Sequence, residues 1–230
     1  MPIIPEIQER LRNAFPETTD IALSRAFKEG LLLADDFYKE GMPFRCPQGQ
    51  DVRGHVRRVC IGVKVREYCT RGDLPFNVEM VRMPHGGWHW LEIKASGALA
   101  HACRTLDVFK FPEEAESRQD YRLSIQPNLL NWFTRDKSIT QILREIPEIY
   151  AWLTYRANGD GTLAHLCWCS PSPENDDWLA HVNVLREIEE KGGAIVPIVS
   201  SVEAPRPRLR DEILQALEEI PLNDNDPKNK

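Results

Sequence analysis

The sequence predicts an α+β fold in which an antiparallel sheet containing two related β-hairpins packs against several helices. Three observations support it: helical apolar spacing in the first 70 residues, strand-like segments separated by short turns in the centre, and a second such pair around an Asn-Gly turn. The 230 residues suffice for one substantial core. The net charge of -6 gives the molecule as a whole no attraction for nucleic acid or anionic lipid.

Helices are expected in the first third of the chain and again near residue 180. Apolar residues recur near helical spacing across residues 5–40, where Thr19 or Asp20 is the candidate N-cap of a second helix. Segment 52–69 is ambiguous, because its valines fit both a helical stripe and a strand-like alternation, and its length favours a helix. A further helix is expected at 174–191, where helical spacing ends at two glycines.

Strands are expected in the centre of the chain and after residue 150. Segments 76–83, 88–94 and 98–105 are separated by a Pro-His-Gly-Gly run and a Ser-Gly pair, which predicts a three-stranded antiparallel meander. Segments 150–157 and 162–170 flank an Asn-Gly-Asp-Gly turn. Because these turn residues tolerate positive φ, the pattern predicts a second hairpin.

The two hairpins resemble each other in sequence once two extra turn residues are allowed in the second. The matched pairs are Trp90 with Trp152, His101 with His165, and Cys103 with Cys167. A four-residue loop in the second hairpin predicts that Thr154 lies opposite His165. The same loop predicts that Trp152 lies opposite Cys167, so that matched residues share one face.

Strand alternation assigns the side chains of the first hairpin to two faces. Small apolar residues suited to packing against helices form one face: Leu91, Ile93, Ala95, Ala98, Ala100 and Ala102. The other face contains most of the polar, ionisable and aromatic side chains: Trp90, Glu92, Lys94, Leu99, His101 and Cys103. Combined with the repeat, the pattern predicts a binding face that contains Trp90, His101, Trp152 and His165.

Two acids and a lysine are expected to meet on this second face. If the Pro-His-Gly-Gly turn closes as a four-residue loop, Glu79 lies opposite Glu92 and close to Lys94. An acid on one strand and Glu-x-Lys on the next resembles the site of the restriction-endonuclease-like PD-(D/E)xK nucleases. The resemblance implies that both carboxylates hold Mg²⁺ and that the lysine stabilises charge developing on phosphate. The alternative is a half-exposed sheet face with a cross-strand salt bridge.

Two further patterns are candidate binding sites. The densest basic segment, which either contacts phosphates or forms a solvated face, contains Arg53, Arg57, Arg58, Lys64 and Arg66. The His-x-Cys pairs at 101–103 and 165–167 raise the question of zinc. Side chains two apart on a strand start roughly 6.5–7 Å apart, which is wide for two ligands with bonds of about 2.0–2.3 Å. We therefore expect buried thiols and hydrogen-bonded histidines, and no metal.

The domain organisation follows from composition and spacing. Residues 1–200 are expected to form a single α+β domain, 201–222 a C-terminal amphipathic helix and 223–230 a disordered tail. The helix at 208–220 either packs on its own domain or binds a protein partner. Because no leader-like or membrane-spanning run is recognised, we expect a cytoplasmic protein with no membrane partner and six free thiols.

Together these patterns favour a cytoplasmic binding or regulatory protein without a clear catalytic motif. The competing hypothesis is a divalent-metal-dependent nuclease that uses Glu79, Glu92 and Lys94, with Mg²⁺ as cofactor and nucleic acid guided by the basic segment. Whether the chain is an enzyme stays open in the sequence, as do its ligand, its partner and its oligomeric state.

Overall fold

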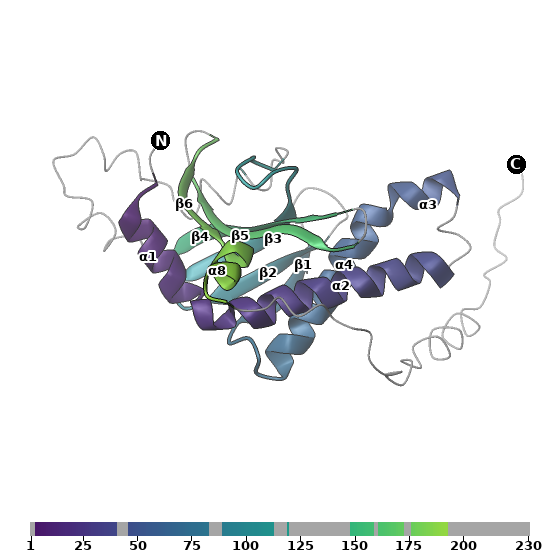
Figure 1. Ribbon diagram of the computed structural model, residues 1–230, viewed down its shortest axis with the longest axis horizontal. Coiled ribbons are helices and arrows are strands. Elements are labelled where there is room, and N and C mark those ends of the chain that lie inside the picture. The colour runs from purple at the N-terminus through teal and green to yellow at the C-terminus, as the bar shows by residue number, and fades with distance from the viewer. Residues whose placement is uncertain are drawn as a thin grey trace, which may run out of the picture. The chain divides into compact units, whose positions relative to one another are not determined.

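A six-stranded sheet with helices along one face forms the described part of the chain. The structure is a computed structural model that describes residues 3–40, 46–82, 89–112, 119, 148–158, 161–172 and 176–192. The strands follow the order β1-β2-β3-β4-β5-β6, and Figure 1 shows α1, α2, α4 and α8 along the same face of the sheet. The predicted α+β class is therefore confirmed. Within these residues, no helix combines the length and the apolar character needed to cross a bilayer.

The helices occupy most of the first 70 residues. Their bounds are Pro5–Ala14 (α1), Glu17–Thr19 (a 3-10 turn), Asp20–Glu40 (α2), Pro47–Asp51 (α3) and Arg53–Thr70 (α4). A proline in the first turn starts α1, where its fixed φ fits a helix and its missing N–H costs no hydrogen bond. The ambiguous segment at 52–69 is helical, because one side of it, including Ile61 and Val65, is buried in the core.

The sheet consists of two three-stranded halves. The first half contains β1 (Asn77–Arg82), β2 (His89–Ala95) and β3 (Ala98–Arg104); the second contains β4 (Ile149–Ala157), β5 (Leu163–Pro171) and β6 (Trp178–Asn183). Neighbours within each half are antiparallel, whereas β3 and β4 are parallel. The sheet is thus mostly antiparallel, and the long connection from β3 to β4 allows the one parallel pair.

The first half has the register that the sequence predicts. Glu79 lies opposite Glu92, and Glu92 lies opposite His101. The tight turn between β2 and β3 contains Gly97 with φ 73°, a conformation that most side chains disfavour. The predicted two faces follow from this register, and the small apolar residues of β2 and β3 face the helices.

The second hairpin is shifted by two residues from its predicted register. Thr154 lies opposite Cys167 and not His165, and Trp152 lies opposite Cys169 and not Cys167. One step of the shift comes from the loop, because the Asn158 N–H donates to the Thr162 carbonyl at 2.7 Å and closes a shorter loop than expected. The other step comes from a β-bulge between Arg156 and Ala157. Because side chains alternate between the two sides of a strand, a shift of two residues leaves each side chain on its predicted face.

The prediction of a helix at 174–191 is wrong for the first half of that segment. Residues Trp178–Asn183 form strand β6, and the helix α8 is confined to Val184–Glu190. Trp178 and Val182 are buried on opposite faces of the sheet, and such two-sided burial produces an apolar run that resembles helical spacing. The Asn183 side chain accepts from the Arg186 N–H and so starts α8. The boundary at 200, the 201–222 helix and the 223–230 tail lie outside the described residues.

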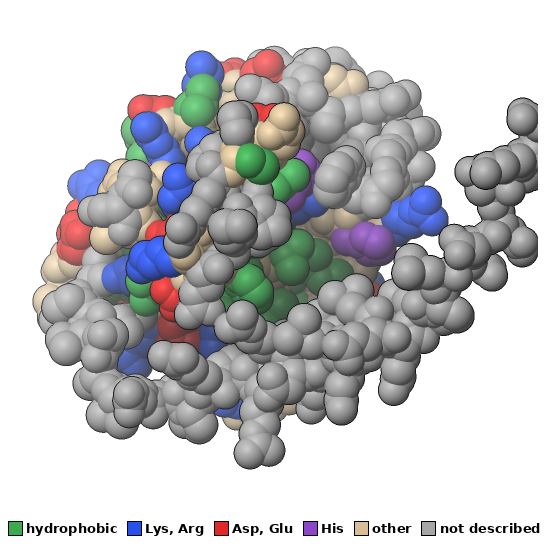
Figure 2. Space-filling model, turned by 90° about the vertical axis from the view of Figure 1, so that its right-hand side faces the viewer, with side chains coloured by type: hydrophobic (Ala, Val, Ile, Leu, Met, Phe, Trp, Pro, Cys, Tyr) green, Lys and Arg blue, Asp and Glu red, His purple; other side chains and the backbone are tan. Residues whose placement is uncertain are grey.

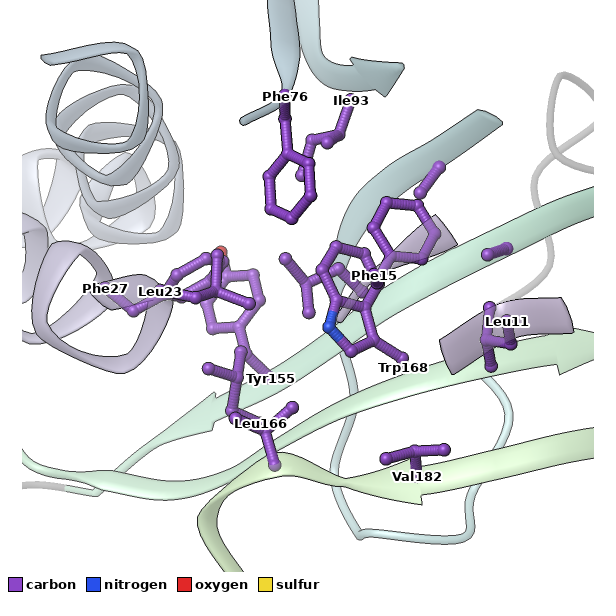
Figure 3. Close-up of a cluster of buried hydrophobic side chains, with 14 of the residues drawn as sticks. Leu11, Phe15, Leu23, Phe27, Phe76, Ile93, Tyr155, Leu166, Trp168 and Val182 are labelled. Atoms are coloured by element: carbon purple, nitrogen blue, oxygen red, sulfur yellow. The ribbon is translucent and has the colours of Figure 1, made fainter. Parts of the chain in front are cut away.

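The main hydrophobic core lies between the helices and the helix-covered face of the sheet. Figure 3 shows Phe15 and Trp168 side by side there, with their ring centroids 3.9 Å apart, and Phe76 meets Phe15 edge-on. Helices α2 and α4 touch at Gly30, where an added Cβ would lie 2.6 Å from the Ile61 Cα. This core fixes the sheet from one side and leaves its other face to carry the polar residues.

Candidate functional site

The face of the sheet that the helices do not cover, called here the second face, carries one polar and aromatic residue from each strand in a single row. Strand pairing sets that row as Glu79, Glu92, His101, Trp152, Cys169 and His181. Neighbouring side chains in such a row start close enough to interact. The first half of the row is ionisable, and the second half is mainly aromatic and sulfur-containing.

The three residues of the nuclease hypothesis lie together at the β1–β2 end of the row. The Lys94 Nζ is 2.9 Å from Glu92 Oε1 and 3.7 Å from Glu79 Oε2. The side chains of Glu79 and Lys94 are about half exposed, whereas that of Glu92 is only 7% exposed. The ammonium group is therefore the cation that relieves repulsion between the two carboxylates.

A hydrogen-bonded chain continues from Glu92 into the sheet. Since a carboxylate only accepts, His101 Nε2 donates to Glu92 Oε2 at 3.1 Å. On the other side of the ring, the Tyr150 hydroxyl lies 2.9 Å from His101 Nδ1, which accepts from it in the neutral imidazole. The Trp90 ring stacks on the His101 ring with centroids 3.9 Å apart. All four of these side chains are buried.

The electrostatics of Glu92 follow from these partners. The hydrogen bond from His101 and the nearby Lys94 ammonium lower the pKa of Glu92 to about 2, although burial acts in the opposite direction. The same carboxylate raises the pKa of Lys94. Both oxygens of Glu92 are thus occupied by groups of the chain itself, and the carboxylate stays ionised near neutral pH.

The geometry does not by itself provide a metal site. Among the described residues, no group of three or more His, Cys, Asp or Glu side chains is placed to hold a metal ion. Lys94 lies between the two carboxylates, so a divalent ion would have to displace it. The Glu-x-Lys strand, β2, leads through a tight turn into β3, whereas the corresponding strand of the PD-(D/E)xK nucleases usually leads into a helix.

The matching residues of the second hairpin have apolar surroundings. Thr154 takes the place of Glu92, and its hydroxyl lies 3.6 Å from the Cys169 Sγ. Burial raises the pKa of Cys167 to about 12, so its thiol is protonated and a poor nucleophile. The His165 Nε2 lies 2.8 Å from the Thr105 hydroxyl, and burial lowers the pKa of this histidine.

Residues 105–112, which follow β3, cover this apolar half of the second face. The Trp178 Nε1 donates to the Phe109 carbonyl at 2.8 Å, and the His181 Nε2 donates to the Val108 carbonyl at 3.0 Å. The Phe111 ring contacts the Trp152 and Trp178 rings. The predicted binding residues Trp152 and His165 are consequently buried beneath the chain itself.

Sequence reasoning missed several residues of this network. Tyr150 could have been found, because it shares the face of Trp152 by strand alternation. Trp178 and His181 were missed because their strand was interpreted as a helix. Thr105 reaches His165 over a separation of 60 residues, a contact for which the sequence carries no local signal.

The predicted basic segment lies on α4 but is joined to acids. Arg53 and Arg57 both approach Asp35 Oδ1, at 3.4 Å and 3.1 Å. Lys64 lies 2.9 Å from Glu67 and 3.8 Å from Glu29, and the Arg58 guanidinium lies near His55. Figure 2 shows basic and acidic side chains interspersed on the face that it presents. The segment therefore has few cations that are available to phosphates.

Comparison with family models, with curated proteins and with solved structures found no match for this chain. The geometry of the second face is therefore the guide to its function. On that face, the closed network around Glu92 is the feature that bears most directly on function.

Proposed function

We propose that this chain is a cytoplasmic binding or regulatory protein and that Glu92 stabilises the fold without taking part in catalysis. The observation that carries the proposal is the enclosure of Glu92, whose two oxygens face Lys94 at 2.9 Å and His101 at 3.1 Å. A catalytic carboxylate needs an open position for metal, water or substrate. Here those positions are filled by side chains of the chain itself.

The lowered pKa of Glu92 supports the same proposal. A general base works best when its pKa lies near the working pH. A carboxylate with a pKa of about 2 is a weak proton acceptor at neutral pH. The hydrogen bonds that lower the pKa also hold the side chain in one geometry, as expected of a structural ion pair.

A divalent-metal-dependent nuclease is the second candidate, and one observation favours it. Lys94 contacts both Glu92 and Glu79, and the Glu79 and Lys94 side chains are about half exposed. If Mg²⁺ displaced Lys94, the two carboxylates would hold the ion and the lysine would be released towards phosphate. In that case nucleic acid is the partner, approached by Arg66 and the other cations of α4.

A nuclease assay separates the two candidates. The purified chain is incubated with plasmid DNA in Mg²⁺ or Mn²⁺, together with the variants Glu92→Gln and Glu79→Gln. We expect no cleavage by any of the three proteins. Because Glu79 is half exposed, Glu79→Gln should fold normally, which a near-UV circular dichroism spectrum checks.

Cleavage by the unmodified chain that Glu79→Gln abolishes would overturn the binding proposal and establish the nuclease. Cleavage that both variants retain comes from outside this triad; it would contradict the binding proposal while leaving Glu92 a structural residue. The amphipathic segment at 208–220 is proposed as a further contact with a protein partner.

A further inference from the structure

The two edges of the sheet are finished differently. At one edge, the Ile4 N–H donates to the Leu179 carbonyl of β6 at 2.7 Å, so the chain just before α1 covers that strand. At the other edge, β1 pairs with β2, and its backbone bonds to nothing further among the residues that the structure describes. Its six residues include no proline and no bulge. Proteins usually cover, kink or shorten such an edge, because its unpaired groups can bind another strand.

The turn between β2 and β3 identifies which backbone groups of β1 point outward. Ala95 and Ala98 flank this two-residue turn and form a hydrogen-bonded pair, so Ala95 bonds towards β3. Because the bonding direction alternates along a strand, Glu92 bonds towards β1, to Glu79 opposite it. The residues between the bonded positions of β1 then direct their N–H and C=O groups away from the sheet: Val78, Met80 and Arg82. These outward groups are called here the β1 edge.

Helix α4 runs beside the β1 edge and presents an exposed apolar side chain there. Gly62 faces β1, since an added Cβ would lie 3.0 Å from the Met80 Sδ. Val59 precedes Gly62 by three residues, a spacing that places both on the same side of the helix. Gly62 is buried, whereas Val59 is 50% exposed. A strand added to β1 would direct alternate side chains towards α4, beside Met80, and would bury Val59.

The second face carries uncompensated negative charge next to the β1 edge. The Lys94 ammonium serves two carboxylates, at 2.9 Å from Glu92 and 3.7 Å from Glu79. The Glu79 side chain is 54% exposed, and it is the last member of the row of polar and aromatic residues. Arg82 belongs to the opposite face by strand alternation. A cation placed opposite Glu79 on an added strand would therefore be favourable.

We propose that the β1 edge binds an extended segment of a partner protein, which adds a strand antiparallel to β1. This inference rests on the proposed binding function and specifies its partner class. The backbone groups of the β1 edge supply the hydrogen bonds, and the flanking side chains supply the selectivity. The partner segment has apolar residues that face α4, alternating with polar residues that include a lysine or arginine opposite Glu79.

A second copy of the chain fits the β1 edge less well. When β1 pairs with itself in an antiparallel arrangement, outward residues must lie opposite outward residues. Arg82, the cation of β1, therefore never lies opposite Glu79, and one of the possible registers places two copies of Glu79 opposite each other. The β6 edge of a second copy is already covered by Ile4.

The test uses the full chain and a synthetic probe. The probe is a short fluorescent peptide in which valine and lysine alternate, and its binding is followed by fluorescence anisotropy. A scrambled peptide of the same composition controls for general attraction to the net charge of -6. A peptide with glutamate in place of lysine tests the charge requirement. We expect binding of the probe in the micromolar range and much weaker binding of both controls.

Methylation of the peptide backbone tests the pairing directly. In the antiparallel arrangement, valines that face α4 direct their N–H groups to the β1 edge, and the lysine N–H groups point away from it. Methylation of the valine amides should therefore weaken binding about 10-fold or more. Methylation of the lysine amides is the matched control and should leave the affinity within about threefold.

Variants of the chain locate the contact. Met80→Pro removes an outward N–H without breaking a bond to β2 and should weaken binding about 10-fold or more. Val59→Glu places a carboxylate beside the apolar residues of the probe and should weaken binding as well. Ile21→Glu, at a position on α2 that is 45% exposed, is the control and should leave the affinity within about twofold. Near-UV circular dichroism checks that each variant folds.

Several results would overturn the proposal. Probe binding that is absent, no tighter than that of the controls, or unchanged by methylation of the valine amides would refute an antiparallel added strand. A dimer of the unmodified chain that Met80→Pro dissociates in sedimentation would assign the β1 edge to a second copy. Tighter probe binding by the double variant Ile195→Ser and Ile198→Ser would assign it to the chain's own β-branched run at 194–199.

Failure of this test leaves the proposed function standing. Loss of strand addition at the β1 edge removes one partner class and does not touch the argument from the enclosure of Glu92. Metal-dependent DNA cleavage that Glu79→Gln abolishes refutes the binding proposal, whatever the peptide does. Because one assay measures peptide binding and the other measures DNA cleavage, the two failures are distinguishable.

Discussion

The two hairpins place Trp and His residues at corresponding positions in their strands, yet their surroundings differ. In the first, Glu92 lies between Lys94 and His101, and the second face is ionic there. In the second, Thr154 replaces the glutamate, and its neighbours are thiols and aromatic rings. The presence of Glu92 in one hairpin and of Thr154 in the other therefore accounts for the ionic network in the first hairpin alone. The tryptophan and the His-x-Cys pair that the hairpins share are therefore explained by packing within the sheet, and they do not by themselves indicate a functional site.

Placing a glutamate in the second hairpin, at the position that matches Glu92, should have the largest effect on stability. Thr154→Glu would bury a carboxylate at a fully buried position whose neighbours are Cys167 and Cys169. We expect a loss of about 3–5 kcal/mol in the free energy of unfolding, because the new charge lacks a lysine or histidine partner. Urea denaturation measures this loss. Thr154→Val, which removes the hydroxyl without adding charge, is the control and should cost far less.

Removing each histidine tests whether the hairpins differ in their energetics as they do in their contacts. His101→Ala deprives Glu92 of one hydrogen bond and Tyr150 of its partner ring, and we expect a cost of about 3–4 kcal/mol. His165→Ala removes one neutral hydrogen bond to Thr105, for which about 1–3 kcal/mol is expected. Urea midpoints compare the two variants. Equal costs would show that the ionic network adds nothing beyond packing.

The pH dependence of stability should show the smallest effect. Between pH 4.5 and about 2, the unfolded chain binds a proton at Glu92 while the folded chain does not, so stability falls as the pH falls. We expect Glu92 to contribute about 1–2 kcal/mol to this loss, because solvent screens the half-exposed Lys94. Thermal unfolding of the unmodified chain and of Glu92→Gln across this range measures the difference. Parallel pH profiles would contradict the lowered pKa.

The pKa of a second carboxylate, that of Asp20, is shifted in the opposite direction from the pKa of Glu92. Burial raises its pKa from 3.8 to about 6, although Arg12 donates to both of its oxygens. Its protonation therefore favours the folded state as the pH falls from about 6 to 3.8. This contribution acts at higher pH than that of Glu92, so the comparison of Glu92→Gln with the unmodified chain isolates the first hairpin.

Local sequence signals predicted the first half of the sheet better than the second. The short turn at Gly97 fixes the pairing of Glu92 with His101, so strand alternation alone places the side chains. In the second hairpin, a bulge and a shorter loop moved the pairing of Thr154 by two residues. A bulge depends on how the finished sheet twists, and no short sequence pattern specifies it.

The long-range contacts of the candidate site were the least predictable. The approach of Lys94 to Glu79 follows from strand register. Residues 105–112 cover Trp152 because of the path that the chain takes after β3. The spacing of apolar residues in the sequence does not predict that path. Strand β6 was mistaken for a helix because burial on both faces removes the alternation that identifies a strand.

The parallel pair of β3 and β4 has a consequence for how the chain folds. Each half of the sheet is assembled from strands that are close in sequence, so its pairing can form quickly. The junction between the halves must wait until more than 40 intervening residues have brought Ile149 beside Ala98, which makes loop closure the slow step. Hydrogen exchange during refolding should accordingly protect amides within each half before those that link β3 to β4.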